Sequence, residues 1–497
     1  MQLLGFDIGS SGIKASLVEA ATGKEIASAT SPEKELEMDA PEPGWAEQNP
    51  ETWWQHIVNV SHEVLEAEQA EPAAVAGIGI AYQMHGLVLV DEDQNVLRPA
   101  IIWCDGRAVD IGNRAFKEIG ESYSLEHYLN SPGNFTASKL RWVKENEPEL
   151  FSKIHKAMLP GDYVAMKLSG QVRTSISGLS EGIFWDYLSS DIATRLLDFY
   201  ELSPDLLPEY DPNFAVSGTL TSQAAEELGL NEGIPIGYRS GDQPNNALSL
   251  NVLNPGEAAA TAGTSGVIYG VTDKPLYDEQ SRVNTFVHVN HDEEQSRYGV
   301  LLCINGTGIL NSWLKNELFN ELNSYEEMNT MASEVAVGSE GIHVFPFGNG
   351  PERVLGQQGI GSQFRNIDFN RHSRAHIIRA AQEGIAFSMN YGLQVMHQMG
   401  LDIDTIRVGK GNMFLSNVFR EAFTNTTGLS VELYDSSGSY GAAIGAGIGI
   451  DAFPNREEAF KGLRKSDTLQ PEPELEKAYS SAYDQWKEKL EKELKTD

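Results

Sequence analysis

Two short turns rich in glycine and hydroxyl side chains, residues 9–12 (Gly-Ser-Ser-Gly) and 263–266 (Gly-Thr-Ser-Gly), constrain the fold more than any other feature. Each follows a run of small or apolar residues and precedes a run of β-branched and apolar ones, which is the pattern of a β-hairpin. The turns lie about one domain length apart. We therefore predict two related halves, each opening with the same hairpin. Two unrelated surface hairpins explain so short a repeat equally well.

The length of the chain also favours two domains. Its 497 residues exceed the roughly 250–300 that one hydrophobic core usually holds. Strand-like runs such as 76–81 alternate with helix-like runs such as 137–146, which indicates an α/β protein. We predict an N-terminal domain of residues 1–245 and a C-terminal domain of residues 246–497, with a cleft between them.

The net charge of the chain limits which kinds of molecule it can bind. There are 37 Lys and Arg against 71 Asp and Glu, which gives a formal net charge of −34. This field repels the phosphate backbone, so we expect no nucleic-acid partner. A nucleotide is repelled as well, so a nucleotide site would need Mg²⁺ and backbone N–H groups to compensate.

The cysteine content and the hydropathy pattern indicate in which cellular compartment the protein is expected. Two cysteines, Cys104 and Cys303, cannot form a disulfide framework and fit a reducing environment. The N-terminal residues lack the pattern of a secretion signal, and there is no run of about 18 apolar residues. We expect a cytoplasmic protein with no membrane partner. The sequence leaves room for a homodimer.

The first turn has the parts that hold a triphosphate. Glycines let the backbone approach closely, and serine hydroxyls and N–H groups donate to phosphate oxygens. Asp7, at the end of the preceding strand, suits Mg²⁺, which is usually bound through one or two carboxylates. A surface hairpin could carry the same residues, but a second turn across a cleft favours a phosphate clamp. The predicted nucleotide-binding residues of the two turns are Gly9, Ser10, Ser11, Lys14, Gly263, Thr264 and Ser265.

A further glycine-rich segment comprises Gly409, Lys410, Gly411 and Asn412, between an apolar strand and a helix predicted to begin near Ser416. Its glycines can admit the flat face of a nucleobase or ribose, although an ordinary loop accounts for it equally well. The later small-residue segment, 435–447, predicts a helix that packs closely, either beside a ligand or in a core.

Polar side chains that suit a polyol follow two other strand-like runs. Gln83, Met84 and His85 offer an amide, a thioether and an imidazole where a strand breaks, and Trp103 and Asp105 add an aromatic platform and a carboxylate. Each group has a structural alternative. The histidine can be a core residue, and the tryptophan can anchor a core beside a surface ion pair.

One carboxylate stands out as a candidate general base. Phosphoryl transfer depends mainly on positioning and on a carboxylate that accepts the proton of the attacking hydroxyl. Asp242 follows a strand-like run and Gly241, and it precedes the helix-compatible residues that begin with Gln243. This location suits a base at the mouth of a cleft. An ordinary helix N-cap is the alternative.

Together these segments resemble the FGGY carbohydrate kinases, within the superfamily of actin, hexokinase and Hsp70 ATPases. The resemblance implies two actin-like (RNase H-like) ATPase domains of the α/β class, ATP as phosphoryl donor, and Mg²⁺. It extends from Gly5 to about Gly449 and depends on segments that occur in the family's order. These are residues 7–14, 44–50, 83–86, 103–107, 241–242, 263–266, 345–347, 351–353 and 379–384.

The resemblance also implies roles for single residues. Asp242 is implied to accept the proton and, with Asp7, to serve Mg²⁺. Met84 and His85 are implied to contact the sugar. The implied neighbours of these residues are Gln83, Trp103, Asp105 and Gln243 at the sugar, and Gly263, Thr264 and residues 409–412 at ATP.

The implied substrate follows from Met84 and His85. This pair is similar to family members that phosphorylate D-xylulose to the 5-phosphate, whereas those that phosphorylate glycerol carry Arg-Glu. Gln243 departs from the usual pattern after Asp242 and leaves room for ribulose, fuculose, gluconate or glycerol, whereas Lys410 departs from the pattern of the adenosine loop and concerns the contacts to the nucleobase. A non-catalytic sugar sensor on the same scaffold is the rival from another class, but the acidic charge argues against the basic helix-turn-helix that such a regulator carries.

Overall fold

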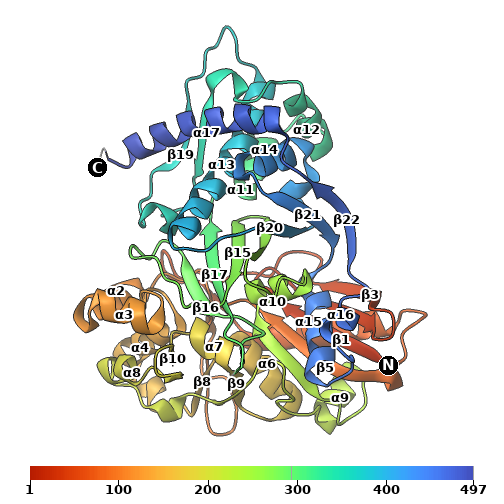
Figure 1. Cartoon of the computed structure of the whole chain (residues 1–497). Helices are drawn as coiled ribbons and strands as arrows, with labels where there is room; N and C mark the ends of the chain where they lie inside the picture. Colours follow the sequence, from red (N-terminus) through yellow and green to blue (C-terminus); the bar gives the residue numbers. More distant parts are fainter. Residues whose placement is uncertain (293, 496–497) are drawn as a thin grey trace.

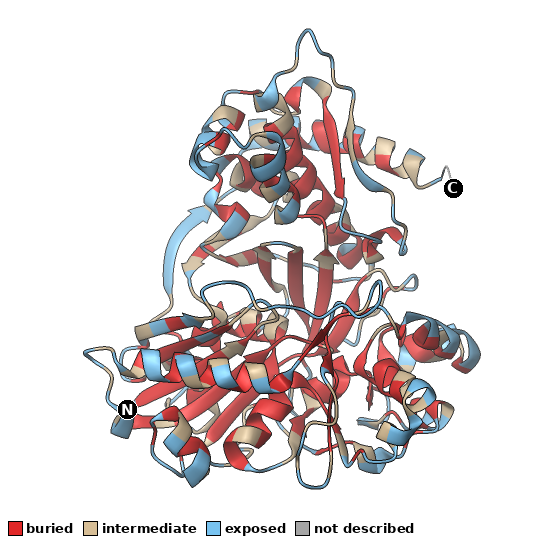
Figure 2. Cartoon of the chain, turned by 180° about the vertical axis from the view of Figure 1, so that it is seen from behind, coloured by how far each residue is buried: buried red, intermediate tan, exposed pale blue. Residues whose placement is uncertain are grey.

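The structure, a computed structural model, describes residues 1–292 and 294–495. Two mixed sheets form the centres of two stacked bodies (Figure 1). We call the body built on the five-stranded sheet the first lobe and the body built on the seven-stranded sheet the second lobe. Buried residues are concentrated in the central strands of both sheets (Figure 2).

The first sheet begins with the predicted hairpin, which is confirmed. β1 (Gln2–Ile8) pairs antiparallel with β2 (Ile13–Glu19), and β2 pairs antiparallel with β3 (Lys24–Ser31). On its other side β1 runs parallel to β5 (Val75–Tyr82), which runs parallel to β13 (Ile236–Gly241). The order is therefore third, second and first strand of a meander, followed by two parallel strands.

The second sheet repeats this order. The strands are β14 (Glu257–Ala262), β15 (Gly266–Thr272), β16 (Asn284–Val287), β17 (Tyr298–Ile304), β20 (Thr405–Gly409), β21 (Ser430–Asp435) and β22 (Arg464–Leu469). Here β15 pairs antiparallel with β14 and with β17, and on the other side of β14 the strands β20 and β21 follow in parallel. An extra antiparallel strand is added at each edge. The prediction of two related halves is thus confirmed in the strand order.

Helices cover both faces of the first sheet. The core on one face is shared with α1 (Pro50–Leu65), α6 (Pro160–Ser169) and α9 (Ser222–Leu228). The other face is covered by α15 (Gly438–Gly449), which comes from the later half of the chain. The approach is so close that a Cβ at position 5 would lie 2.0 Å from the Ser439 carbonyl oxygen.

The second lobe is organised around one long helix. α13 (Arg374–Gln398) is flanked by α14 (Asn417–Thr427) and α17 (Pro473–Glu493), with α11 (Gly308–Trp313) and α12 (Tyr325–Ser333) beside it. The C-terminal helix α17 packs onto this core through Trp486, which is fully buried and donates to the Val344 carbonyl oxygen over 2.8 Å.

A helical region inserted between β5 and β13 joins the lobes. It shares a buried cluster with one face of the second sheet, including Tyr269 and Phe286. Its helices are α2 (Val109–Ile119), α3 (Glu121–Tyr128), α4 (Thr136–Asn146), α7 (Ile176–Glu181) and α8 (Thr194–Tyr200).

Short elements complete the fold. They are β4 (Glu47–Gln48), β6 (Val88–Val90), β7 (Ala100–Ile101), α5 (Pro148–Phe151), β8 (Lys156–Met158), β9 (Arg173–Ser175), β10 (Trp185–Asp186), β11 (Asp191–Ile192), β12 (Glu209–Asp211), β18 (His343–Phe347), β19 (Gly361–Arg365) and α16 (Arg456–Ala459).

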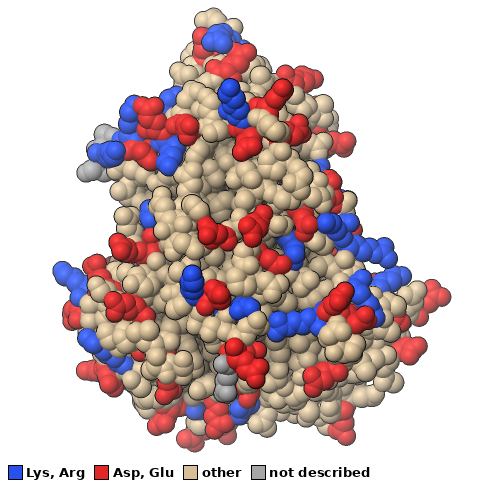
Figure 3. All heavy atoms as spheres, in the orientation of Figure 1, with Lys and Arg blue, Asp and Glu red and all other residues tan. Residues whose placement is uncertain are grey.

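The predicted domain boundary at residue 245 falls inside α10 (Asp242–Ser249), a helix that contacts strands of both sheets. It stays a prediction. Within residues 1–292 and 294–495, no helix combines the length and the apolar character needed to cross a bilayer. Acidic side chains are spread over both lobes on the face shown in Figure 3.

Candidate active site

Three neighbouring strands of the first sheet end at the same edge. β1, β5 and β13 run parallel, and their last residues Ile8, Tyr82 and Gly241 share one register. Ligands of α/β sheets bind outside the carboxyl ends of such strands. The predicted residues Asp7, Gln83 and Asp242 therefore converge, as expected from their positions after apolar runs.

Asp242 is the first residue of α10. The N-cap position belongs to Gly241, and no side chain caps the helix there, so capping does not account for the carboxylate. The Gln243 side-chain amide donates to Asp242 Oδ2 over 3.3 Å. Burial raises the pKa of Asp242 to about 7, and the negative charge of Asp7 adds to the effect. A carboxylate with a pKa near neutrality is well matched to accepting a proton at physiological pH.

Asp7 lies on β1 opposite the exposed Lys14 on β2. Burial raises the pKa of Asp7, while the charge of Lys14 opposes the rise. A Cβ at position 438 would lie 2.3 Å from Asp7 Oδ2, so the amino end of α15 abuts this carboxylate. Two close carboxylates in a shielded site would be stabilised by a cation.

The donor set fits Mg²⁺ rather than a metal held by protein alone. Among residues 1–292 and 294–495, no group of three or more His, Cys, Asp and Glu side chains is arranged to hold an ion. Mg²⁺ needs only one or two carboxylates when phosphates and water supply its other ligands. Asp7 and Asp242 supply two.

The nucleotide segments lie beside one another. A Cβ at Gly263 in the second turn would be 3.4 Å from the Asn412 side-chain amide. Lys410 N–H donates to the Tyr434 carbonyl oxygen over 2.8 Å, which holds residues 409–412 against the end of β21. Since β21 leads directly into α15, Asp7 and residue 409 lie near the amino end of that helix, and the second turn lies beside Asn412.

The remaining residues of both turns occupy the same region. In the first turn Gly9 N–H donates to the Gly12 carbonyl oxygen over 3.0 Å, and the hydroxyl of Ser10 accepts from Trp103 Nε1 over 3.2 Å. In the second turn the Gly263 and Thr264 carbonyl oxygens accept from the start of α11. Ser11, Thr264, Lys410 and Asn412 are exposed, whereas Gly9, Ser10, Ser265 and Gly411 are half-buried.

The Met84–His85 turn lies next to the candidate base. A Cβ at Gly241 would be 2.6 Å from Met84 Cγ, so this side chain packs against the residue that precedes Asp242. The His85 ring meets Phe135 edge-on, with ring centroids 4.7 Å apart, and Phe286 of the second lobe at 5.3 Å. The turn thus lies where the two lobes meet.

Two predicted sugar-binding residues are engaged inside the protein. The buried Asp105 carboxylate accepts from Ala46 N–H over 2.6 Å and from the Arg107 side chain over 2.7–3.0 Å. The amide nitrogen of Gln83 donates to Gln48 Oε1 over 3.2 Å, while its buried Oε1 has no partner. By contrast, Trp103 is 43% exposed and borders the first turn, so it is not a core anchor.

Three charged residues near the sugar site were not among the predicted site residues. Glu181 and Lys139 are buried and bond to His85, and Arg353 of the second lobe stacks over the Phe135 ring at 5.8 Å. Glu181 and Lys139 carry no sequence signal, because a charged residue in a helix is usually exposed. Arg353 does occur in a segment, 351–353, that supports the family resemblance.

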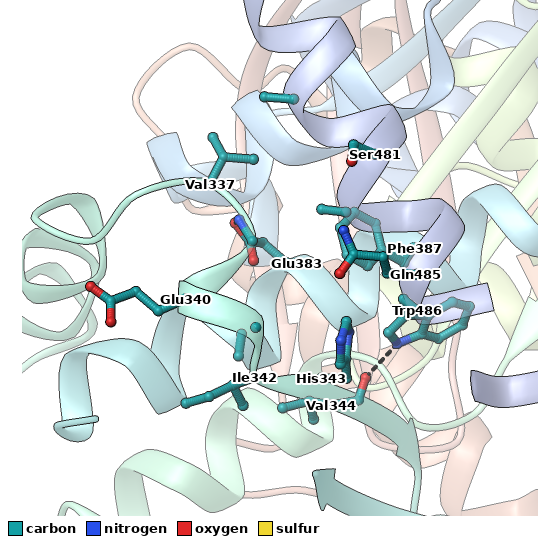
Figure 4. A pocket seen from close by; sticks show the side chains of 15 residues that line it. Val337, Glu340, Ile342, His343, Val344, Glu383, Phe387, Ser481, Gln485 and Trp486 are labelled. Carbon is teal, nitrogen blue, oxygen red and sulfur yellow. Dashed lines mark hydrogen bonds between the residues drawn. The ribbon is translucent and has the colours of Figure 1, made fainter. Parts of the chain in front are cut away.

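A cavity of about 210 Å³ occupies a different part of the molecule (Figure 4). It lies in the second lobe between β18, α17 and the short helix η4 (Ser339–Gly341), and Glu383 and Trp486 line it. None of the predicted site residues contributes to its walls. The candidate active site is therefore the convergence at the strand ends and not this cavity.

Comparisons with known proteins find similarity to one family along most of the chain. Residues 2–249 match the N-terminal domain of the FGGY family of carbohydrate kinases, and residues 258–450 match its C-terminal domain. A xylulose kinase of Bacillus subtilis (strain 168) is 28% identical over 496 residues, which cover 98% of this chain and 96% of that protein.

Solved structures share the fold. A xylulose kinase from Rhodospirillum rubrum superposes with a TM-score of 0.88 at 24% identity, covering 99% of each chain. A gluconate kinase from Lactobacillus acidophilus reaches 0.89 at 19% identity, covering 100% of this chain and 98% of that one. Both comparisons describe the fold and leave the substrate open.

Proposed function

The chain belongs to the FGGY family of carbohydrate kinases, and from this premise we propose that it transfers the γ-phosphoryl group of ATP to the terminal hydroxyl of a ketose, first of all D-xylulose. The observation that carries the proposal is the position of Asp242. It directly follows β13, beside Asp7 and next to the Met84–His85 turn.

In the proposed reaction the Asp242 carboxylate accepts the proton of the terminal sugar hydroxyl as that oxygen attacks the γ-phosphorus. The bond from the γ-phosphorus to the bridging oxygen breaks, and ADP leaves. Backbone N–H groups of the two turns receive the phosphates, and residues 409–412 border the nucleobase or ribose. Mg²⁺ held by Asp7 and Asp242 would offset the phosphate charge when bound. Closure of the lobes excludes water that would otherwise accept the phosphoryl group.

The sugar is proposed to lie between Met84, His85, Trp103 and Gln243. Gln243 Oε1 is buried without a partner among the described residues, which makes it available to a hydroxyl donor. Asp105 is proposed to act indirectly, because its carboxylate is already bonded to Ala46 and Arg107 and would fix the loop that carries Trp103.

The preference for D-xylulose draws its support from the relatives. Xylulose kinases from several bacteria are 27–28% identical over most of the chain. Gluconate stays among the alternative substrates that Gln243 leaves open, together with ribulose, fuculose and glycerol.

A coupled ADP-release assay across pentuloses, hexuloses, gluconate and glycerol tests the proposal. We expect the highest kcat/KM with D-xylulose, and ³¹P NMR of the product should show a phosphate monoester at C5. A higher kcat/KM with gluconate or glycerol would replace the proposed substrate. Asp242→Asn should lower kcat by a factor of about 10² or more, the loss associated with removing a general base.

A further inference from the structure

The turn that carries His85 is held at its backbone by two buried ionisable side chains. His85 has a φ of +60°, a left-handed conformation that is uncommon outside glycine. Its N–H donates to Glu181 Oε1 over 3.3 Å, and its carbonyl oxygen accepts from Lys139 Nζ over 2.8 Å. Glu181 is 1% exposed and Lys139 is fully buried, so water does not compete for these bonds.

A third hydrogen bond determines which ring nitrogen of His85 carries the hydrogen. His85 Nδ1 lies 2.9 Å from the main-chain oxygen of Glu181. A carbonyl oxygen can only accept, so Nδ1 carries the hydrogen, and in the neutral ring Nε2 is an acceptor. Burial, reinforced by the charges of Lys139 and Arg353, lowers the pKa of His85 to about 3 and keeps the ring neutral. Nε2 has no partner within the part of the chain that the structure describes.

The ring is also fixed by its neighbours. Phe135 meets it edge-on and Phe286 packs against it from the second lobe. Glu181 borders the base as well as the histidine, because a Cβ at Gly241 would lie 2.6 Å from Glu181 Oε2. The orientation of His85 Nε2 relative to Asp242 therefore depends on Glu181, because this buried side chain bonds to His85 and also packs beside Gly241, the residue before Asp242.

Building on the proposed function, we infer that Glu181 is a positioning residue of the sugar site, which holds His85 so that Nε2 accepts a hydrogen bond from one particular sugar hydroxyl. This arrangement restricts which group of the sugar can face Nε2. A keto oxygen only accepts, so it cannot be the group that faces Nε2, and a sugar without a hydroxyl at that position leaves Nε2 unpaired.

Kinetics of Glu181 variants test the inference. Glu181→Ala removes the acceptor for His85 N–H, and the loss of about one hydrogen bond should raise KM for the ketose about fivefold while kcat and KM for ATP change by less than about threefold. Glu181→Gln retains an acceptor oxygen and should restore KM. Should the alanine variant fail to fold, Glu181→Asp, which withdraws the carboxyl by one methylene, gives the same readout.

Deoxy analogues separate positioning from a general structural effect. In the wild type, one monodeoxy ketose should show a marked loss of kcat/KM, and Glu181→Ala should reduce that loss. Glu383→Ala is the matched control, since Glu383 is another buried glutamate, 2% exposed, at the cavity of Figure 4. It should lower the melting temperature and leave the analogue ratio unchanged. An unchanged ratio and KM in Glu181→Ala would overturn the inference.

A measurement without substrate keeps the inference independent of the proposed function. In ¹⁵N-histidine NMR of the whole protein, with His85→Gln used for assignment, His85 should show a protonated Nδ1 and an unprotonated Nε2. A protonated Nε2 would overturn the inference whatever the substrate. If the wild type turned over no ketose, the proposed function would fail, while the NMR result would still decide the tautomer.

Discussion

Replacing Asp242 by Asn should make the protein more stable while nearly abolishing phosphoryl transfer. Burial, with the negative Asp7 beside it, raises the pKa of Asp242 from 3.8 to about 7, so the folded protein disfavours the ionised carboxylate. At about 1.4 kcal/mol per pH unit the rise corresponds to about 4 kcal/mol. Because Asp242 is half-buried and water screens it, we expect a gain of about 1–2 kcal/mol, or about 2–4 °C in melting temperature.

The predicted stability gain of the Asp242→Asn variant depends on pH. A carboxyl whose pKa rises on folding destabilises the folded protein only where it is ionised. For the wild type the penalty is absent below about pH 4, grows between about pH 4 and 7, and is complete above pH 7. The gain from Asp242→Asn should therefore be full near pH 8 and much smaller near pH 5.

Thermal unfolding followed by circular dichroism at both pH values, together with ADP release, provides the assay. Asp273→Asn, at an exposed aspartate directly after β15, is the matched control and should change neither quantity. A variant that is less stable than the wild type near pH 8, or one with the same gain at both pH values, would refute the reasoning.

Three further predictions follow from the described contacts. Gly438→Ala would place a Cβ 2.3 Å from Asp7 Oδ2, so we expect kcat to fall about tenfold or more with little change in melting temperature, and unchanged steady-state kinetics would contradict this. Below about pH 7, kcat/KM for the sugar should fall about tenfold per pH unit, because only the ionised Asp242 accepts a proton; a flat profile between pH 5.5 and 7 would exclude Asp242 as the base. Trp486→Ala removes a fully buried indole and its bond to Val344, and should cost about 3–5 kcal/mol in denaturant unfolding, whereas a loss under about 1 kcal/mol would count against this account of the second core.

The strand ends were predictable from local sequence. Apolar runs that stop at a glycine or a polar residue marked the positions of Asp7, Gln83 and Asp242, and parallel pairing then brings such ends to one edge. The two hairpins were predictable for a similar reason, since Gly and Ser turns between β-branched runs have few other conformations open to them.

Burial and pairing of charged groups were not predictable. The spacing of Asp105 and Arg107 suggests an ion pair at the surface, yet the side chains of both residues are buried. The Asp105 carboxylate also accepts from the N–H of Ala46, which lies 59 positions away in the sequence. Glu181 and Lys139 sit on helices with no local signal, and only the folded chain shows that each bonds to the backbone of His85.

The placement of α15 bears on how the protein is made. This helix belongs by sequence to the later half of the chain but covers the apolar face of the first sheet formed by Leu3, Val18 and Tyr238. During synthesis that face stays uncovered until about 450 residues have left the ribosome, because the helix that seals it ends at Gly449. Truncation at any earlier point would therefore leave even the residues translated first without a complete core.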